Sequence, residues 1–267
     1  RGVVTLAQPM VIQDGHDAIY LDHSHLQIAP GQTLSNYLDA LPFKLGAEVE
    51  VTGVVDPGGY APWIIMHTIR RLGTQPLPDP VTLDIAQLFA GEGVGRRVRT
   101  TGVVQAVLED PKRWSLVFES ASRRFSVTIT KAVMPKLPEG LVDADVEVAG
   151  VGKSFRNTRG EFIAPGLYLA SVEDLRVIRE PGMGPFELPI TPLGSIARYR
   201  STPLGGHRVR TSGVVSFFAP PGTLFLQDGI GGVQVDLAPS GDDAARFEPG
   251  DRIEVAGFPD MSTGIGA

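Results

Sequence analysis

The chain has 267 residues, a length typical of two or three domains, and 42% of them are hydrophobic, enough to form real cores. It contains no cysteine, which excludes disulfides, thiolate nucleophiles and cysteine-ligated zinc. The formal net charge of −6 argues against a general nucleic-acid binder, because such proteins usually carry a basic face. No run approaches about 18 consecutive apolar residues, so the sequence predicts no membrane-spanning helix.

The first elements along the chain are short strands joined by tight turns. Gly-Val-Val at residues 2–4 opens an apolar strand, and MVIQDGHDAIYLD (10–22) is typical of a β-hairpin around Gln-Asp-Gly. The segment AEVEVTG (47–53) alternates apolar with polar residues, which predicts a strand with one buried face. A last strand is expected from GGYAPWII (58–65), and the proline-rich segment 73–80 then ends the domain.

The same blocks recur twice further along the chain. The Gly-Val-Val and (A/D)-x-(V/I)-E-V-x-G blocks lie at 2–4 and 47–53, at 102–104 and 144–150, and at 213–215 and 251–257. The second block begins 97 and then 107 residues after its preceding copy, so each repeat has about one hundred residues. The predicted domains are therefore residues 1–75, 76–180 and 181–267.

Short amphipathic helices are predicted before the second and third copies, at 82–90 and 193–201. The chain begins with Arg1 inside a strand-like run and ends at GIGA (264–267), so we expect a piece of a longer protein. In that interpretation the first repeat lacks its helix and the third lacks its last strand, which leaves the third barrel open with an unpaired edge.

Five strands per hundred residues, with glycines at bends, favour a mostly all-β fold of tandem five-stranded OB-like Greek-key barrels, each preceded by a short helix. The motifs resemble the OB-like repeats in the extracytoplasmic sensory regions of bacterial sensor histidine kinases of two-component systems and of GGDEF-type signalling proteins. The motifs that carry the resemblance are LxSIA (193–197), RVRxxGVV (208–215), LFLQDGxGGVQV (224–235), PGDRIEVAG (249–257) and GGYAPWI (58–64). The second repeat departs from the pattern, since FESASRR (118–124) replaces Gln-Asp-Gly.

The resemblance implies a periplasmic or extracellular part of a bacterial membrane protein that binds a small molecule or a protein partner without catalysis. The membrane and an output module would then be reached through segments outside this sequence, and a homodimer is conceivable. A purely structural spacer is the remaining alternative. No serine-hydrolase elbow, zinc-protease helix or phosphate-binding loop is present, so we expect no enzymatic activity and no cofactor from this sequence.

Four residues are candidates for ligand binding. In a purely structural interpretation Gln-Asp-Gly forms a turn, because Asp supplies the side-chain hydrogen bond and Gly the positive φ that a tight turn needs. The functional interpretation places Asp14 and Asp228 near a barrel mouth, in contact with a ligand. Tyr60 and Trp63 lie beside a glycine pair and could form an aromatic platform or pack on the barrel.

The second repeat offers a different partner, because residues 81–180 hold 14 basic against 13 acidic side chains while the other repeats are acidic. Its expected loop GKSFRNTRGEF (152–162) contains Lys153, Arg156 and Arg159 for phosphates and Phe155 for stacking on a base. Nucleic acid or another polyanion is therefore kept as the alternative, although the overall charge argues against it. His23 and His25 project to one face of an extended strand and are weak metal candidates, without a counterpart in the other repeats.

Overall fold

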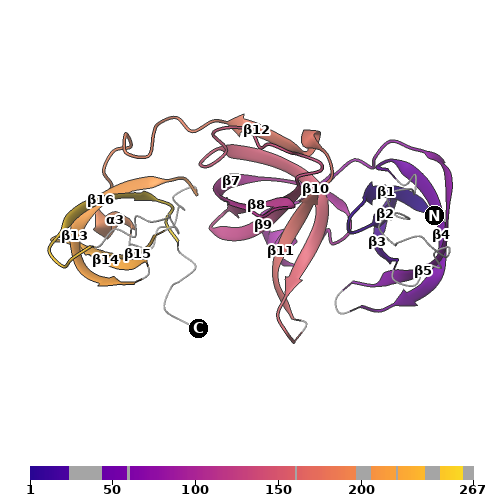
Figure 1. The fold of residues 1–267 in the computed structure, drawn as a ribbon, viewed down its shortest axis with the longest axis horizontal. Coiled ribbons are helices and arrows are strands. Elements are labelled where there is room, and N and C mark those ends of the chain that lie inside the picture. The colour runs from indigo at the N-terminus through magenta and orange to yellow at the C-terminus, as the bar shows by residue number, and fades with distance from the viewer. Residues whose placement is uncertain are drawn as a thin grey trace. The chain divides into compact units, whose positions relative to one another are not determined.

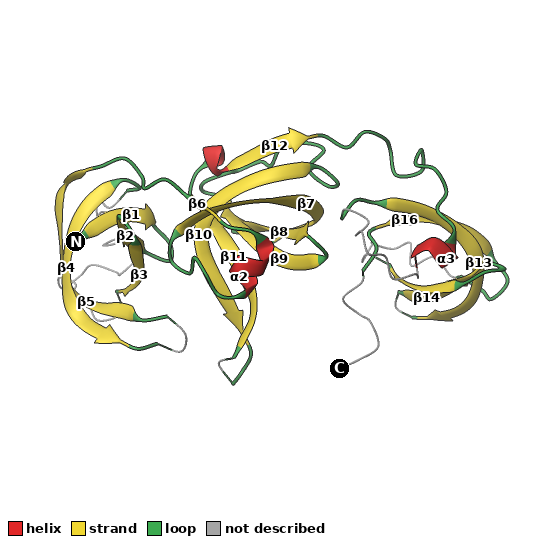
Figure 2. Ribbon diagram, turned by 180° about the vertical axis from the view of Figure 1, so that it is seen from behind, coloured by secondary structure: helices red, strands yellow, loops and turns green. Residues whose placement is uncertain are grey.

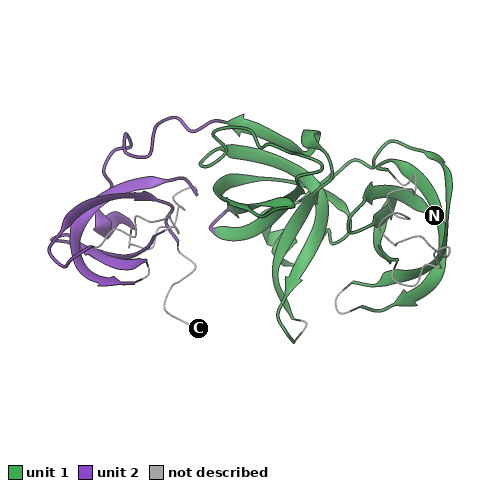
Figure 3. Cartoon of the chain, viewed as in Figure 1, with its two compact units in different colours: residues 1–119, 123–179 green, residues 120–122, 180–267 purple. Residues whose placement is uncertain are grey.

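The computed structural model describes residues 1–23, 44–58, 61–159, 161–196, 206–220, 222–237 and 247–260. Their regular secondary structure is almost entirely β-strand, with only short helices (Figure 2). They form two compact units, of residues 1–119 with 123–179 and of residues 120–122 with 180–267 (Figure 3). No described helix is both long and apolar enough to cross a membrane.

The first barrel of unit 1 is closed by five strands in the spatial order β1-β2-β3-β5-β4 (Figure 1). The strands are β1 (Gly2–Leu6), β2 (Val11–Asp14), β3 (Asp17–Asp22), β4 (Ala47–Asp56) and β5 (Trp63–Thr74). All neighbours are antiparallel except β3 and β5, which are parallel. Val4, Val49 and Met66 are fully buried inside this barrel.

The second barrel repeats this order with β7-β8-β9-β11-β10, and the pairing of β10 with β7 closes it. Its elements are β6 (Val81–Thr82), α2 (Ile85–Phe89), β7 (Arg97–Glu109), β8 (Arg113–Ser120), β9 (Arg123–Thr130), β10 (Asp145–Arg156), β11 (Phe162–Leu169), the 3₁₀ turn η1 (Val172–Asp174) and β12 (Leu175–Arg179). The predicted helix at 82–90 is shorter than expected. Val81 and Thr82 pair with β7, and Asp84 then caps the helix by accepting from the Gln87 amide.

Unit 2 contains α3 (Leu193–Ile196) and a four-stranded sheet in the order β15-β14-β13-β16. Its strands are β13 (Val209–Ala219), β14 (Thr223–Gln227), β15 (Gly232–Asp236) and β16 (Arg252–Gly257). Within the residues described, this sheet is open; that the third repeat lacks its last strand stays a prediction. The fold class of tandem OB-like barrels is thus confirmed, with two barrels closed. The rest of the helix predicted at 193–201 lies outside the described residues.

All three repeats use the same strand register. The glycine of each Gly-Val-Val block lies on the first strand of its repeat (β1, β7 or β13) and faces the equivalent residue of the fourth strand (β4, β10 or β16), in the pairs Gly2–Val49, Gly102–Val146 and Gly213–Ile253. The following valine faces the equivalent polar residue near the end of the second strand (β2, β8 or β14), in the pairs Val3–Gln13, Val103–Glu119 and Val214–Gln227. Equal registers at both positions support one β-module present in three copies.

The three glycines are required by a close backbone approach. A Cβ atom at Gly2, Gly102 or Gly213 would lie 3.1, 2.5 or 2.9 Å from the carbonyl oxygen of the strand-two residue that its neighbour faces. Any larger residue there would push strand two away from strand one. The glycines are therefore architectural in each copy.

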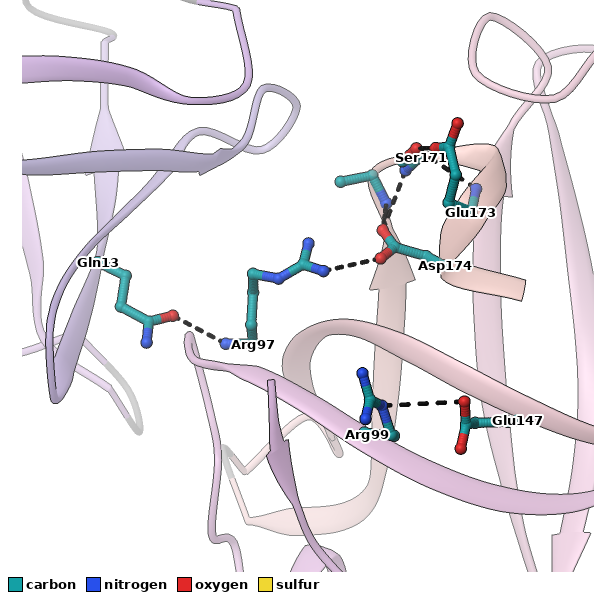
Figure 4. Close-up of polar contacts among 8 residues, drawn as sticks. Gln13, Arg97, Arg99, Glu147, Ser171, Glu173 and Asp174 are labelled. Atoms are coloured by element: carbon teal, nitrogen blue, oxygen red, sulfur yellow. Dashed lines mark hydrogen bonds and ion pairs between the residues drawn. The ribbon is translucent and has the colours of Figure 1, made fainter. Parts of the chain in front are cut away.

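The two barrels of unit 1 are joined by an apolar cluster and a polar network. Leu6 and Val11 of the first barrel pack with Val151 and Ala170 of the second. The Arg97 amide donates to Gln13 Oε1 at 3.0 Å (Figure 4). The boundary predicted between residues 75 and 76 thus falls inside one compact unit, whereas the boundary at 180 and 181 lies near the start of unit 2.

A buried ion pair lies beside this joint. Arg97 Nη2 is 2.8 Å from Asp174 Oδ1, and both side chains are less than a tenth exposed. Asp174 Oδ2 also accepts from the amides of Ala170 and Ser171, at 3.2 and 3.1 Å (Figure 4). Arg97 Nε and Nη1 are buried without a hydrogen-bond partner among the described residues, so the carboxylate is the main compensation for this buried cation.

We expect Gly102→Ala to destabilise unit 1 by about 2 kcal/mol, because the new methyl group overlaps the Glu119 carbonyl. Urea unfolding followed by tryptophan fluorescence measures this, since Trp63 and Trp114 both belong to unit 1. Gly73→Ala is the matched control, because the nearest atom there is a Glu48 carboxylate oxygen at 3.7 Å. Equal stability of the two variants would contradict the close-approach argument.

Arg97→Met should lower the free energy of unfolding by about 3 kcal/mol, since it leaves the buried Asp174 carboxylate without its cation. Adding Asp174→Asn to that variant removes the unpaired charge and should recover part of the loss, again measured by urea unfolding. An Arg97→Met protein within about 0.5 kcal/mol of the parent would show that the pair contributes little.

Candidate functional site

The two Gln-Asp-Gly turns use their aspartates to organise the hairpin. Asp228 Oδ1 accepts from the amides of Ile230 and Gly231 at 2.8 and 2.7 Å, and its Oδ2 accepts from Leu193 at 3.1 Å. The Ile230 amide, followed by that of Gly231, holds the pKa of Asp228 below its usual range. Asp14 Oδ1 accepts from the Asp17 amide at 3.3 Å. Both residues thus fill the turn role, and ligand binding by them stays a prediction.

The hairpin of the second repeat forms its turn with other residues than Gln-Asp-Gly. Its tip places Ala121 and Ser122 at φ values of 46° and 64°, as a two-residue hairpin turn requires. Glu119, which replaces the glutamine of the other repeats, is buried and accepts from Gln105 Nε2. Arg124 Nε in turn donates to Gln105 Oε1 at 2.7 Å. The polar position before the turn is therefore used internally in this barrel.

A cation held between two aromatic rings lies on the outer face of the second barrel. Lys153 Nζ lies 4.1 Å from the ring centre of Tyr168 and 4.4 Å from that of Phe155, and it donates to Thr128 Oγ1 at 2.8 Å. We call Lys153, Phe155, Tyr168 and Thr128 the Lys153 cluster. The part of the chain that the structure describes offers Lys153 no ion-pair partner.

The strand alternation explains why these residues meet. Val127 and Leu167 point into the barrel core, so Thr128 and Tyr168, which directly face each other on β9 and β11, point outward. Lys153 and Phe155 lie on the adjacent strand β10, which extends to Arg156. The expected loop at 152–162 is therefore wrong in its first half: residues 152–156 are strand, because β10 and β11 continue to pair beyond the barrel.

A glycine on β11 makes room for the cluster. Gly166 faces Lys153, and a Cβ atom there would lie 2.6 Å from Lys153 Cε and 2.9 Å from the Phe155 ring. Both barrels have an Ala-Pro pair at this place, at 61–62 and 164–165, so the position equivalent to Gly166 in the first barrel is Trp63. The lysine stem and the phenylalanine ring thus occupy the space of a side chain that β11 lacks.

The surroundings of the cluster shift the pKa values of Lys153 and Tyr168. Burial, with a smaller contribution from the nearby charge of Arg113, lowers the pKa of Lys153 from 10.5 to about 8. Burial raises the pKa of Tyr168, and Arg113 partly opposes that rise. At neutral pH Lys153 is therefore charged but incompletely solvated, a state that an incoming anion would stabilise.

The other predicted polyanion residues lie further along the same hairpin. Arg156 ends β10 and is half-buried, whereas Arg159 is exposed in the following turn, where its amide donates to Asn157 Oδ1 at 2.9 Å. Sequence reasoning missed Tyr168, Thr128 and Arg113, since nothing in a single apolar strand shows which lysine it faces. Period-two alternation around Leu167 was the available signal.

The remaining candidates are dispersed. Trp63 is the first residue of β5 and is 40% exposed. His23 follows β3, and no group of three metal-ligating side chains occurs among the described residues. Tyr60 and His25 lie outside the described residues.

Comparison with known proteins gives distant similarities in fold. No protein-family model matches the chain. No curated protein matches it. Among solved structures, aspartyl tRNA synthetase from Entamoeba histolytica is 11% identical over 39% of this chain and 23% of that chain, with a TM-score of 0.29. Asparaginyl-tRNA synthetase from Pyrococcus horikoshii, complexed with asparaginyl-adenylate, is 23% identical over 38% of this chain and 22% of that chain, with a TM-score of 0.27.

A murine DNA binding protein bound with double-stranded DNA is 11% identical over 64% of this chain and 84% of that chain, with a TM-score of 0.29. This chain spans less than a quarter of the length of either synthetase.

The expectation against a nucleic-acid partner is wrong, because the matched proteins are tRNA synthetases and a protein bound with DNA. The physical reason for the error is that a net charge summed over three repeats does not describe one face of the middle barrel. At such TM-scores the similarity assigns no ligand to this chain, so the proposal below depends on the side chains.

The depressed pKa of Lys153 is open to direct measurement. NMR titration of the lysine side chains should give one pKa near 8, assigned to Lys153 by its absence in Lys153→Met. Because the folded pKa lies below the unfolded value of 10.5, the contribution of Lys153 to the free energy of unfolding should rise between pH 8 and 10.5. Lys153→Met should lack that rise. A Lys153 pKa above 10 would contradict the burial argument.

Proposed function

We propose that the second barrel of unit 1 binds single-stranded nucleic acid on the outer face of the neighbouring strands β8, β9, β11 and β10. The observation that carries the proposal is the Lys153 ammonium, held between the rings of Phe155 and Tyr168 without an ion-pair partner in the described residues. A cation beside an exposed ring suits a phosphate followed by a stacked base.

The position of the cluster in the fold supports this proposal. OB barrels bind oligonucleotides or oligosaccharides across strands two and three and the adjoining loops, and β8 and β9 are those strands here. Arg113 and Arg124 alternate with the core residues of these strands and therefore share the outer face. Glu119 on the same face is only 7% exposed and is occupied by Gln105. Arg113 is paired with Asp110, Nε to Oδ2 at 2.5 Å, so Lys153 is the cation of this cluster that has no ion-pair partner among the described residues.

The chemistry of the cluster favours an anion with an aromatic group. Phe155 is 39% exposed and offers a ring surface for stacking. Lys153 is partly desolvated, so its attraction to a phosphate is screened less than that of a surface lysine. No step of this recognition requires catalysis. A sensory-region origin, an extracytoplasmic location and a lack of enzymatic activity stay predictions from the sequence.

Fluorescence anisotropy with labelled single-stranded DNA at about 50 mM salt tests the proposal. We expect micromolar binding that weakens steeply with salt, and Lys153→Met should reduce the salt slope by about 1 because one phosphate contact is lost. Phe155→Ala should weaken binding by about 5-fold or more through lost stacking. Binding should also weaken as the pH rises through about 8, where Lys153 loses its charge.

Lys136→Met is the matched control, because Lys136 is an exposed lysine of the same barrel whose charge pairs with Glu139 at 2.8 Å. It should bind DNA as the parent does. Heparin tests the wider polyanion class: equal affinity for heparin, insensitive to Phe155→Ala, would favour a polyanion site without base recognition. Absence of DNA binding at about 50 mM salt would refute the proposed function.

A further inference from the structure

An exposed tryptophan of the first barrel lies next to the joint with the second. Trp63 on β5 directly faces Tyr20 on the parallel strand β3. Their following residues, Ile64 and Leu21, belong to the core of the first barrel, so both aromatic rings project from its outer face. Trp63 is 40% exposed, whereas Tyr20 is half-buried.

Tyr20 connects this face to the Lys153 cluster. Its hydroxyl donates to the carbonyl oxygen of Gly152 at 2.8 Å, and Gly152 immediately precedes Lys153. Tyr20 and Tyr168 belong to the same apolar cluster between the barrels. Burial, followed by the proximity of Tyr168, raises the pKa of Tyr20 far above its ordinary value, so its hydroxyl remains a donor.

The aromatic residues therefore form a series across the joint: Trp63, Tyr20, Tyr168 and Phe155. The two end members are about equally exposed, at 40% and 39%, and the two tyrosines between them are half-buried. In both views the β4–β5 and β10–β11 hairpins, which carry the end members, project to the same side of unit 1 (Figures 1 and 2).

We propose that one single strand of nucleic acid spans both barrels of unit 1, with a base stacked on Phe155 and a later base stacked on Trp63. This inference rests on the proposed function and extends its site from one barrel to two. Base stacking on aromatic rings is tolerant of sequence, which suits a ligand read by its backbone and ring faces. The joint through Gln13 and Arg97 holds the two surfaces together before binding, so little ordering is required.

The two ends of the series differ in charge. The β4 residue that faces Trp63 is Asp56, an acidic residue whose Oδ1 accepts a hydrogen bond from the Gly58 amide at 2.7 Å. The Phe155 end has Lys153. Trp63 should therefore contribute stacking that is independent of salt, whereas Lys153 contributes a salt-dependent phosphate contact.

The chain has two tryptophans, so Trp114→Phe leaves Trp63 as the sole fluorescent reporter. Oligonucleotides of about 12 nucleotides should quench Trp63 on binding, whereas those of about 4 nucleotides, held at the Lys153 cluster, should not. In the parent chain, Trp63→Ala should weaken binding of the longer oligonucleotide at least about 5-fold without changing the salt dependence of its affinity. The affinity for the shorter oligonucleotide should stay unchanged. Leu72→Ala, also exposed on β5, is the matched control and should change neither affinity.

The outcomes separate this inference from the proposed function. Binding of the longer oligonucleotide that depends on Lys153 but leaves Trp63 fluorescence and the Trp63→Ala affinity unchanged would overturn the two-barrel site alone. Failure of either oligonucleotide to bind the parent chain would overturn both. Urea unfolding of each variant checks that the affinity changes occur in folded protein.

Discussion

The approach of a hairpin carbonyl to a glycine of strand one is the constraint on which the whole chain depends. Gly2, Gly102 and Gly213 each face this carbonyl, and each sits at the same register against strand four. The close approach lets strand one curve across the barrel while pairing with strands two and four together. The same local solution therefore fixes the register of all three sheets.

The residue whose carbonyl makes this approach has a different side-chain role in each repeat. Gln13 accepts from the backbone of the second barrel, Glu119 is buried against Gln105, and Gln227 is exposed. Because the backbone position is fixed by the glycine, the side chain is free to serve different purposes. In the first repeat it helps to join the barrels and in this way brings Tyr20 to Gly152, beside Lys153.

The sequence predicted the architecture better than the site. The repeated Gly-Val-Val and (V/I)-E-V blocks report on the backbone, so the strands and the OB-like fold class could be predicted from them. The site depends on which side chains of three different strands share a face, and Tyr168 and Thr128 gave no polar motif to mark them. The loop expected around Lys153 failed because ladder pairing extends β10 and β11 beyond the barrel. The net charge was a poor guide, since it sums a second repeat of 14 basic and 13 acidic side chains in residues 81–180 with two acidic repeats.

The partial burial of Lys153 has a chemical consequence beyond recognition. An amine with a pKa of about 8 is substantially unprotonated in mildly alkaline solution, where ordinary lysines remain almost fully protonated and unreactive. In that pH range a larger fraction of Lys153 than of the other lysine side chains is thus present as the free amine. Among the lysine side chains, an acylating reagent that reaches Lys153 Nζ would react there at a lower pH than elsewhere, and would place a covalent label beside Phe155 and Tyr168.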